Sequence, residues 1–286
     1  MQDNLLLTGK VAVVTGGGGG IGRAIALAYA EAGADIVVGD IVPQRCEEVA
    51  ARIRAMGRRA LGVPMNVMET DQVRALIDSA NTEFARLDIL VNNAGGTRSQ
   101  PFLEQSEKSW RRVIDLNLLS MFAASAAAAP LMIAGGRGGA IINVSSIEAS
   151  RAAPNFAVYA ACKAGMENFT RTLALELSGH GIRVNAIAPD FTETPGLRGN
   201  PTGPVDPAAW IKFTPQQQET IARRIPLGRT GVDVECGNAA LFLASDMSSY
   251  ITGTVLRVDG GTWASSGWIR NRSGRWVLGE EMSGEN

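Results

Sequence analysis

Short, nearly continuous apolar runs alternate with longer amphipathic stretches along most of the chain. Apolar runs of this kind are typical of strands buried on both faces of a parallel sheet, because helices cover both sides. The predicted strands are VAVV (11–14), DIVVG (35–39), ALGVP (60–64), DILVNN (88–93), AIINVSS (140–146), IRVNAIAP (182–189) and TVLRVDGG (254–261). The predicted helices span residues 20–32, 43–56, 70–85, 107–134, 155–179 and 232–245.

This alternation predicts an α/β fold in which strand–helix–strand units build a doubly wound parallel sheet with helices on both faces. We expect seven strands in one domain over residues 1–262. Residues 190–228 break the alternation and are rich in Pro, Thr and Gln, so we expect a substrate lid or a disordered loop there. Residues 263–286 form a tail with three of the five tryptophans, which we expect to pack on its own or a neighbouring subunit.

Composition narrows the classes of protein that the chain can belong to. A formal net charge of −1 argues against a nucleic-acid surface, which needs a basic stripe. The N-terminal MQDNLLLTGK has no basic region, so we expect no signal peptide and a cytoplasmic protein. The most apolar stretch, residues 120–136, contains Pro130 and is shorter than a bilayer span, so we expect a buried helix and no membrane partner.

Cysteine and histidine usage predicts neither a metal site nor a serine-hydrolase triad. Cys46, Cys162 and Cys236 are far apart, no CxxC occurs, and His180 is the only histidine. A His/Cys metal site needs several such ligands at short spacing. A Ser-His-Asp triad would have to use His180, which lies in the turn-like sequence SGHG.

Five consecutive glycines, Gly16 to Gly20, lie between the first predicted strand and the first predicted helix. In that context glycines permit a tight turn and let a pyrophosphate approach backbone N–H groups at the helix N-terminus. Asp40 ends the second predicted strand 18 residues after Gly22, where a carboxylate accepts a hydrogen bond from an adenosine ribose. The pattern predicts a dinucleotide site. The alternative is a flexible glycine turn with an ordinary surface aspartate.

Tyr159 and Lys163 are four positions apart and share one face of a predicted helix, with Cβ atoms about 6 Å apart. A phenol with a pKa near 10 is a poor base at neutral pH. A nearby ammonium favours the phenolate, so we expect Lys163 to lower the pKa of Tyr159 and to make it a general acid/base. The alternative is a core tyrosine beside a surface lysine.

The spacing of Thr15, Gly16, Gly20 and Gly22, TGxxxGxG, resembles that of the short-chain dehydrogenase/reductase family. The resemblance extends over roughly residues 8–262, through NNAG (92–95), Asn117, Ser146, Tyr159 with Lys163, RVNAIAP (183–189) with Thr194, PLGRTG (226–231) and FLASDMSSYITG to VDGG (242–261). It implies a Rossmann-type fold and an oxidoreductase that interconverts a secondary alcohol and a ketone by hydride transfer to or from a nicotinamide cofactor.

The resemblance also implies a role for each matching residue. Tyr159 is the general acid/base, Ser146 hydrogen-bonds the substrate oxygen, Lys163 also holds the nicotinamide ribose, and Asn117 anchors a water that links Lys163 to solvent. The cofactor-binding residues that it implies are Gly16, Gly20, Ile21, Gly22, Asp40, Asn66, Val67, Asn93, Ala94, Gly95, Tyr159, Lys163, Pro189, Thr192 and Thr194.

The residues around Asp40 predict NAD(H) over NADP(H). The Asp40 carboxylate repels a 2′-phosphate, and Ile41 and Val42 place no arginine there to receive one. Family members that use NADPH often carry a basic side chain at the position of Gly19. Arg45 is close enough in sequence to be an exception.

Three positions depart from the family pattern. Asn66 replaces an aspartate before Val67, and its amide still offers an acceptor and a donor. Cys162 replaces a serine before Lys163, and we favour a packing role over a reactive thiol. Asp190 replaces a glycine after Pro189; we favour a turn-compatible substitution over a contact with substrate or lid.

For the substrate we expect contacts with Ser146, Glu148, Tyr159, Phe191 and Trp210, although Glu148 can equally be a solvated surface carboxylate. Apolar residues in the lid favour a bulky or cyclic hydrophobic alcohol or ketone of steroid or terpenoid type. A 3-oxoacyl thioester reductase, a polyol or sugar dehydrogenase, and a non-enzymatic dinucleotide sensor are the alternatives. The resemblance and the alanine-rich helix around residues 113–134 predict a homotetramer.

Overall fold

Seven parallel strands form the central sheet in the order β3-β2-β1-β4-β5-β6-β9. Their bounds are Val11–Thr15 (β1), Asp35–Asp40 (β2), Ala60–Pro64 (β3), Ile89–Asn92 (β4), Gly139–Val144 (β5), Ile182–Pro189 (β6) and Val255–Val258 (β9). The computed structural model describes residues 6–200 and 203–279, so the predictions for residues 1–5 and 280–286 lie outside it. The strand order reverses between β1 and β4, which confirms the predicted doubly wound sheet.

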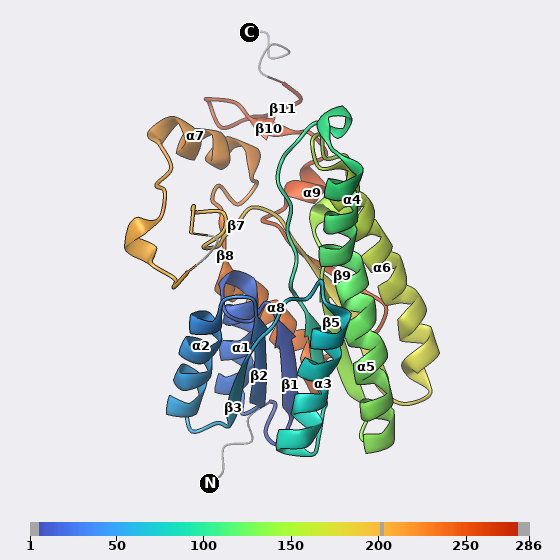
Figure 1. Cartoon of the computed structure of the whole chain (residues 1–286). Helices are drawn as coiled ribbons and strands as arrows, with labels where there is room; N and C mark the ends of the chain where they lie inside the picture. The colour runs from blue at the N-terminus through green and yellow to red at the C-terminus, as the bar shows by residue number, and fades with distance from the viewer. Residues whose placement is uncertain (1–5, 201–202, 280–286) are drawn as a thin grey trace.

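Helices cover both faces of this sheet (Figure 1). One face carries α1 (Gly20–Glu31), α2 (Pro43–Ala55) and α8 (Asp233–Ala244), and the other α3 (Thr70–Phe84), α5 (Ser120–Gly135) and α6 (Ala157–Ser178). Each face has its own apolar core, and the apolar side chains of the central strands point to one core or to the other. Such two-sided burial explains why the strands read as continuous apolar runs.

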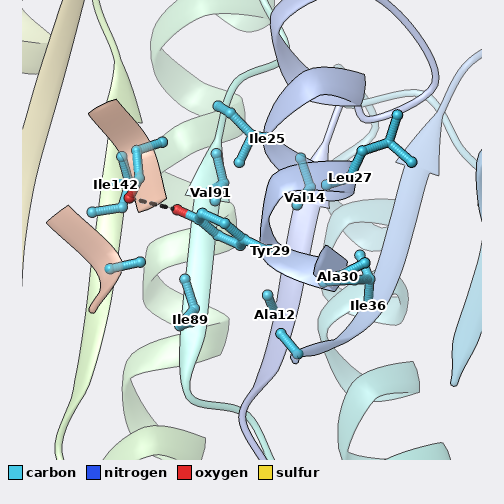
Figure 2. Close-up of a cluster of buried hydrophobic side chains, with 14 of the residues drawn as sticks. Ala12, Val14, Ile25, Leu27, Tyr29, Ala30, Ile36, Ile89, Val91 and Ile142 are labelled. Carbon is cyan, nitrogen blue, oxygen red and sulfur yellow. Dashed lines mark hydrogen bonds between the residues drawn. The ribbon is translucent and has the colours of Figure 1, made fainter. Parts of the chain in front are cut away.

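The core between α1 and α8 is built around Tyr29, which is fully buried (Figure 2). Its hydroxyl donates a hydrogen bond to the carbonyl oxygen of Ala240 at 3.1 Å, so the one polar atom of the ring is satisfied. Val14 and Val91, from neighbouring strands, lie beside the ring. This packing fixes α1 against the sheet and with it the helix end that follows the glycine turn.

The predicted helix over residues 107–134 is three consecutive pieces. These are α4 (Glu107–Ile114), a π-helical turn (Asp115–Leu119) and α5. By length and composition alone, the segment Glu107–Gly135 is a candidate membrane span. Core helices pass the same test, and α5 packs against α3 and the sheet with Ala124, Ala128 and Met132 buried.

Residues 190–228 contain structure that the sequence pattern did not predict. The elements there and just beyond are β7 (Thr192–Glu193), a 3₁₀ turn (Pro207–Ala209), α7 (Pro215–Arg224) and β8 (Gly231–Val232). A reciprocal pair of hydrogen bonds between Thr214 and Gln217 caps the start of α7. No residue of this short helix is buried, so its sequence shows no apolar period that would have predicted it.

The C-terminal segment contains α9 (Thr262–Ser265), β10 (Ile269–Arg270) and β11 (Trp276–Val277), and it lies beside α7 at one end of the molecule (Figure 1). The Arg223 guanidinium donates to the carbonyl oxygen of Arg270 at 2.7 Å. Arg270 in turn donates to the carbonyl oxygen of Pro226 at 3.3 Å. These bonds join the described part of the tail to the lid of its own chain.

Candidate active site

The glycine turn and the NNAG segment meet at the carboxyl ends of β1 and β4, the point where the strand order reverses. The Asn93 amide donates to the carbonyl oxygens of Thr15 and Gly16, each at 3.0 Å. Gly16 has a φ of +63°, and a Cβ on Gly22 would lie 2.2 Å from the oxygen of Gly16. No other residue type fits at Gly22, so the turn and the first turn of α1 pack backbone against backbone.

The N-terminus of α1 is free of side-chain caps. Gly19 is its N-cap, and no acidic residue lies in the first turn. Unsatisfied N–H groups and the positive end of the helix dipole therefore face the end of the sheet, which suits a phosphate. Gly20 has a φ of +50°, and a Cβ there would lie 3.0 Å from a methyl carbon of Thr194. The segment after β6 thus returns to the glycine turn, beside Ile21.

Asp40 lies directly against the glycine turn. One carboxylate oxygen accepts from the N–H of Gly18 at 3.0 Å, and the other accepts from the N–H of Val42 at 2.9 Å. A carboxylate has about four acceptor positions, so ribose hydroxyls can still bind. The bare turn, the uncapped helix and this carboxylate together fit the adenosine and pyrophosphate of a dinucleotide.

Arg45 corrects one step of the cofactor argument. Ile41 and Val42 place no arginine directly after Asp40, but Arg45, the exception that the sequence left open, folds back from α2 until its Nη1 lies 3.0 Å from where a Gly19 Cβ would be. The residue is 6% exposed. Its guanidinium donates to the carbonyl oxygens of Gly203 at 2.5 Å and Asn200 at 2.9 Å. Arg45 is thus the exception that its place in the sequence allowed, because the first turn of α2 brings it back toward the glycines.

The remaining predicted cofactor residues also lie at or just after the carboxyl ends of strands of the central sheet. The Asn66 amide oxygen accepts from the N–H of Met68 at 3.1 Å, which shapes the turn that buries Val67. The N–H of Ala94 donates to the Thr15 hydroxyl at 3.2 Å. Pro189 ends β6, and Thr192, buried at 6% exposure, opens β7.

Lys163 is buried beneath the site, and its ammonium donates to the carbonyl oxygen of Val144 at 2.8 Å. A Cβ on Gly95 would lie 3.3 Å from Nζ of Lys163 and 2.7 Å from Oδ1 of Asn117. Gly95 therefore lets these two side chains approach the NNAG backbone. Burial lowers the pKa of Lys163 to about 8.

Tyr159 lies one helical turn before Lys163, whose Nζ is 5.6 Å from the centre of the phenol ring. Burial raises the pKa of Tyr159, a hydrogen bond with Ser146 lowers it in part, and the charge of Glu148 raises it further. The prediction that Lys163 lowers the pKa of this phenol is wrong for the chain by itself. The ammonium donates its hydrogen bond to the carbonyl oxygen of Val144 and lies over the face of the phenol ring.

Ser146 and Glu148 follow β5. The Ser146 hydroxyl accepts from the N–H of Glu148 at 3.3 Å and so begins the short 3₁₀ turn Ile147–Ala149. The Glu148 side chain is 22% exposed and pairs with both Nε and Nη2 of Arg151, at 3.2 and 2.8 Å. Glu148 is thus neither a freely solvated surface carboxylate nor remote from Tyr159.

Asn117 lies in the π-helical turn and is fully buried. Its amide nitrogen donates to the carbonyl oxygens of Gly96 and Val113, each at 2.9 Å, and its oxygen accepts from the N–H of Gly96 at 2.9 Å. In an α-helix the carbonyl of Val113 would bind the backbone N–H of Asn117. The side chain takes that acceptor, which explains the widened turn and holds Asn117 beside the NNAG segment.

Asp190 is a second correction. We favoured a replacement for a glycine in an unusual backbone conformation, but Asp190 is not among the described residues with positive φ. Its carboxylate lies 3.5 Å from Nη2 of Arg151 and is hydrogen-bonded by Thr262. Burial raises the pKa of Asp190, and Thr262 and Arg151 lower it in part. The residue ties the end of β6 to the segment after Ser146 and to α9.

The two predicted lid contacts lie further into residues 190–228. Phe191 stacks on Phe213 with ring centres 5.7 Å apart, and Arg198 lies over the Phe213 ring at 3.7 Å. Trp210 follows the 3₁₀ turn, and its buried Nε1 has no hydrogen-bond partner within residues 6–200 and 203–279. Their contact with substrate stays a prediction.

The other residue types that could carry chemistry, cysteine and histidine, are either packed in the interior or distant from the carboxyl ends of the strands. Cys162 is 3% exposed, and burial raises the pKa of its thiol, which supports the packing role. His180 is exposed, beyond the opposite end of α6 from Tyr159. In the described ranges, no group of three or more His, Cys, Asp or Glu side chains is arranged to hold a metal ion.

Arg151 is the residue of this site that the sequence analysis missed. Its spacing of three residues from Glu148 was a possible signal, since such pairs meet on one turn of helix. Nothing in the sequence indicated Asp190 as its second partner, 39 residues away.

Comparison with known proteins gives consistent results over nearly the whole chain. The family described as enoyl-(acyl carrier protein) reductase matches residues 16–262. The 3-oxoacyl-[acyl-carrier-protein] reductase FabG of Thermotoga maritima is 38% identical over 255 residues, 89% of this chain and 98% of the relative. The cis-4-hydroxycyclohexanecarboxylate dehydrogenase of Sinomonas cyclohexanicum is 41% identical over 253 residues, 88% of this chain and 96% of the relative.

A solved structure shows the same similarity in three dimensions. The 7α-hydroxysteroid dehydrogenase complexed with NADH and 7-oxo glycochenodeoxycholic acid matches with a TM-score of 0.82 at 36% identity, covering 91% of this chain and 97% of that one. Fold, site and relatives together define the class: an oxidoreductase that interconverts an alcohol and a ketone. Within that class, the chain belongs to the short-chain dehydrogenase/reductase family, whose members use a nicotinamide cofactor.

Proposed function

We propose that the protein is an NAD(H)-dependent dehydrogenase/reductase that interconverts a cyclic or bulky hydrophobic secondary alcohol and its ketone. The observation that carries the proposal is the placement of Tyr159, hydrogen-bonded to Ser146, directly above the buried Lys163. These groups lie at the same carboxyl-terminal end of the sheet as the glycine turn and Asp40. Few other chemistries need a phenol, a hydroxyl and an ammonium in this order beside a dinucleotide cradle.

In this proposal Tyr159 moves the proton and Ser146 orients the substrate oxygen. When bound, the nicotinamide exchanges a hydride with the substrate carbon, and its oxidised form adds a positive charge that favours the phenolate. The ammonium of Lys163 lies near Gly95, and so does the side-chain oxygen of Asn117. A proton that leaves the phenol of Tyr159 therefore has a buried polar route, by way of Lys163 and Asn117, that leads away from the substrate.

The preference for NAD(H) rests on Asp40. A carboxylate bonded to the N–H of Gly18 holds negative charge where a 2′-phosphate would have to lie. Arg45 does not offset this charge freely, because the carbonyl oxygens of Asn200 and Gly203 already occupy its guanidinium. The related 7α-hydroxysteroid dehydrogenase structure contains NADH, which agrees with this preference.

The substrate class rests on the lid and on the relatives. The lid, residues 190–228, contains aromatic side chains, of which Phe191 and Phe213 stack on each other. One relative is a dehydrogenase of a hydroxycyclohexane acid and another is bound to a steroid ketone, and both are cyclic substrates. A 3-oxoacyl thioester is the second candidate, because the Thermotoga maritima relative is a 3-oxoacyl reductase.

Absorbance of reduced nicotinamide tests the proposal directly. We expect cyclic secondary alcohols to reduce NAD⁺ with a higher kcat/KM than acyclic polyols or 3-hydroxyacyl thioesters. Replacing Tyr159 by Phe is expected to lower kcat by about 10³-fold, the scale of general acid/base catalysis, while dinucleotide still binds. Tight dinucleotide binding without turnover of any alcohol or ketone would instead favour a sensor. Near-normal kcat in Tyr159→Phe would reject the assignment of Tyr159.

We further propose a cytoplasmic homotetramer with one domain over residues 1–262 and a lid over 190–228. Leu119, Ile133 and Leu175 are exposed apolar side chains on the α5 and α6 side of the sheet, which suits a contact between copies. Light scattering should report four subunits, and a monomer at micromolar concentration would contradict the assembly.

A further inference from the structure

A cavity of about 470 Å³ opens beside the proposed active site, between the end of α7, the tail and the segment after Ser146. Two arginines and two tryptophans of its wall, Arg151, Arg224, Trp263 and Trp268, carry the argument. We propose that this cavity receives a carboxylate group of the substrate, so that the enzyme acts on cyclic hydroxy or oxo acids. This inference rests on the proposed function and narrows its substrate class.

The cavity is joined to the reacting groups by a chain of charges. Arg151 is held by Glu148, two residues after Ser146, and by Asp190 at the end of β6. The charge of Glu148 acts on Tyr159, and that of Arg224 acts on Asp190. A substrate with its alcohol at Tyr159 therefore extends naturally toward these arginines.

Both arginines keep donors for a ligand. Glu148 and Asp190 engage Nε and Nη2 of Arg151, but its Nη1 has no hydrogen-bond partner in the part of the chain that the structure describes. Arg224 is exposed, and no carboxylate of residues 6–200 or 203–279 is within ion-pair distance of it. Guanidinium groups with free N–H pairs bind carboxylates in bidentate fashion.

The charge balance favours a monoanion over a phosphate. The charged groups around the cavity are Arg151, Arg224 and Arg257, which stacks on Trp263, together with Glu148, Asp190 and Asp259. These six side chains are formally neutral before any ligand binds. A carboxylate adds one negative charge, whereas a phosphate monoester at neutral pH adds almost two beside the same carboxylates. The indole rings of Trp263 and Trp268, 39% and 45% exposed, supply an apolar wall for a ring system.

The test compares acid and ester substrates in wild type and two variants. The probes are 4-hydroxycyclohexanecarboxylate and its methyl ester, with a hydroxylated bile acid and its methyl ester as the larger pair. Arg224→Gln removes the exposed cation of the cavity. Arg52→Gln is the matched control, because Arg52 is also exposed and also lies in the last turn of a helix, α2.

We expect Arg224→Gln to lower the acid-to-ester ratio of kcat/KM by about 10-fold or more, the scale of a charge-assisted hydrogen bond. The loss should appear mainly in KM, and Arg52→Gln should keep the wild-type ratio. A ratio unchanged in Arg224→Gln, with esters and acids both turned over, would overturn the inference and leave the proposed function intact.

A binding measurement keeps the inference testable if no probe reacts. Calorimetry with NAD⁺ present would measure binding of cyclohexanecarboxylate, which lacks the reacting hydroxyl, and of inorganic phosphate. Weaker binding of the carboxylate to Arg224→Gln than to wild type supports the cavity assignment even where turnover fails and the proposed function falls. Equal binding to both proteins, or tighter binding of phosphate, would contradict it.

Discussion

The ammonium of Lys163 donates a hydrogen bond to the carbonyl oxygen of Val144 at 2.8 Å, inside the protein and below the phenol of Tyr159. The last residue of β5 thus binds the ammonium, while α6 carries the phenol whose ring the ammonium faces. This arrangement has a consequence for stability as well as for chemistry, because burial lowers the pKa of Lys163 to about 8.

In the unfolded chain a lysine has a pKa of about 10.4, so between the two values the unfolded state binds more protons and stability rises with pH. Relative to a Lys163→Met variant, wild type should gain about 2 kcal/mol of unfolding free energy from about pH 7 to about pH 9.5. Urea unfolding at several pH values measures this. Lys108→Met, which removes an exposed lysine of α4, should follow wild type in parallel, and a flat difference for Lys163→Met would contradict the burial of its charge.

Gly22→Ala is expected to destabilise the fold by about 2 kcal/mol or more and to abolish dinucleotide binding. The new Cβ would lie 2.2 Å from the backbone oxygen of Gly16 and close to Nδ2 of Asn93, which donates a hydrogen bond to that oxygen. The control is Gly179→Ala, because no atom lies within 4 Å of a Cβ there and its φ is −62°. Thermal unfolding and NADH fluorescence titration provide the two readouts, and equal behaviour of both variants would disprove the close contact.

Glu148→Gln should move the lower limb of the pH profile for alcohol oxidation to lower pH. The Glu148 charge raises the pKa of Tyr159, so its removal lets the phenol ionise more readily. Initial rates with saturating NAD⁺ across the pH range measure the limb. Glu107→Gln removes an exposed carboxylate that pairs with Arg111, and its profile should match wild type. A limb that moves upward in Glu148→Gln would reject this coupling.

Asp40→Ala should raise the NADP-to-NAD ratio of kcat/KM by about 10- to 100-fold, because it removes the charge opposed to a 2′-phosphate. The structure adds a second part to this prediction. Arg45 lies beside Gly19, so part of the gain should disappear in the double variant Asp40→Ala/Arg45→Gln. Asp71→Ala, an exposed site on α3, is the charge-matched control. A wild-type ratio that already favours NADP would contradict the role of Asp40.

Much of the fold was predictable because its signals are local. The predicted strand over residues 60–64 is β3 residue for residue, and the predicted helix over 70–85 differs from α3 by one residue at its end. Apolar runs report two-sided burial wherever a strand lies in a parallel sheet. Gly22 and Asn117 were likewise indicated by motif, and Gly22 answers a backbone requirement of its own turn.

Contacts between distant segments were not predictable in the same way. The pattern did not predict α7, because no residue of this helix is buried and its sequence therefore lacks an apolar period. A polar contact, from Arg223 to the carbonyl oxygen of Arg270, joins the helix to the tail. The sequence predicted plain helix at Asn117, because two of the three hydrogen bonds that hold its side chain in the π-helical turn are made with the backbone of Gly96, 21 residues away.

The sequence by itself determined the doubly wound sheet, the glycine turn and the order of Ser146, Tyr159 and Lys163, because periodicity and short spacing act between near neighbours. Only the tertiary structure decided that Arg45 reaches the turn, that Asp190 and Glu148 share Arg151, and that burial governs the pKa values of Tyr159 and Lys163. Those properties depend on which distant groups exclude water from one another, and that is set by packing in three dimensions.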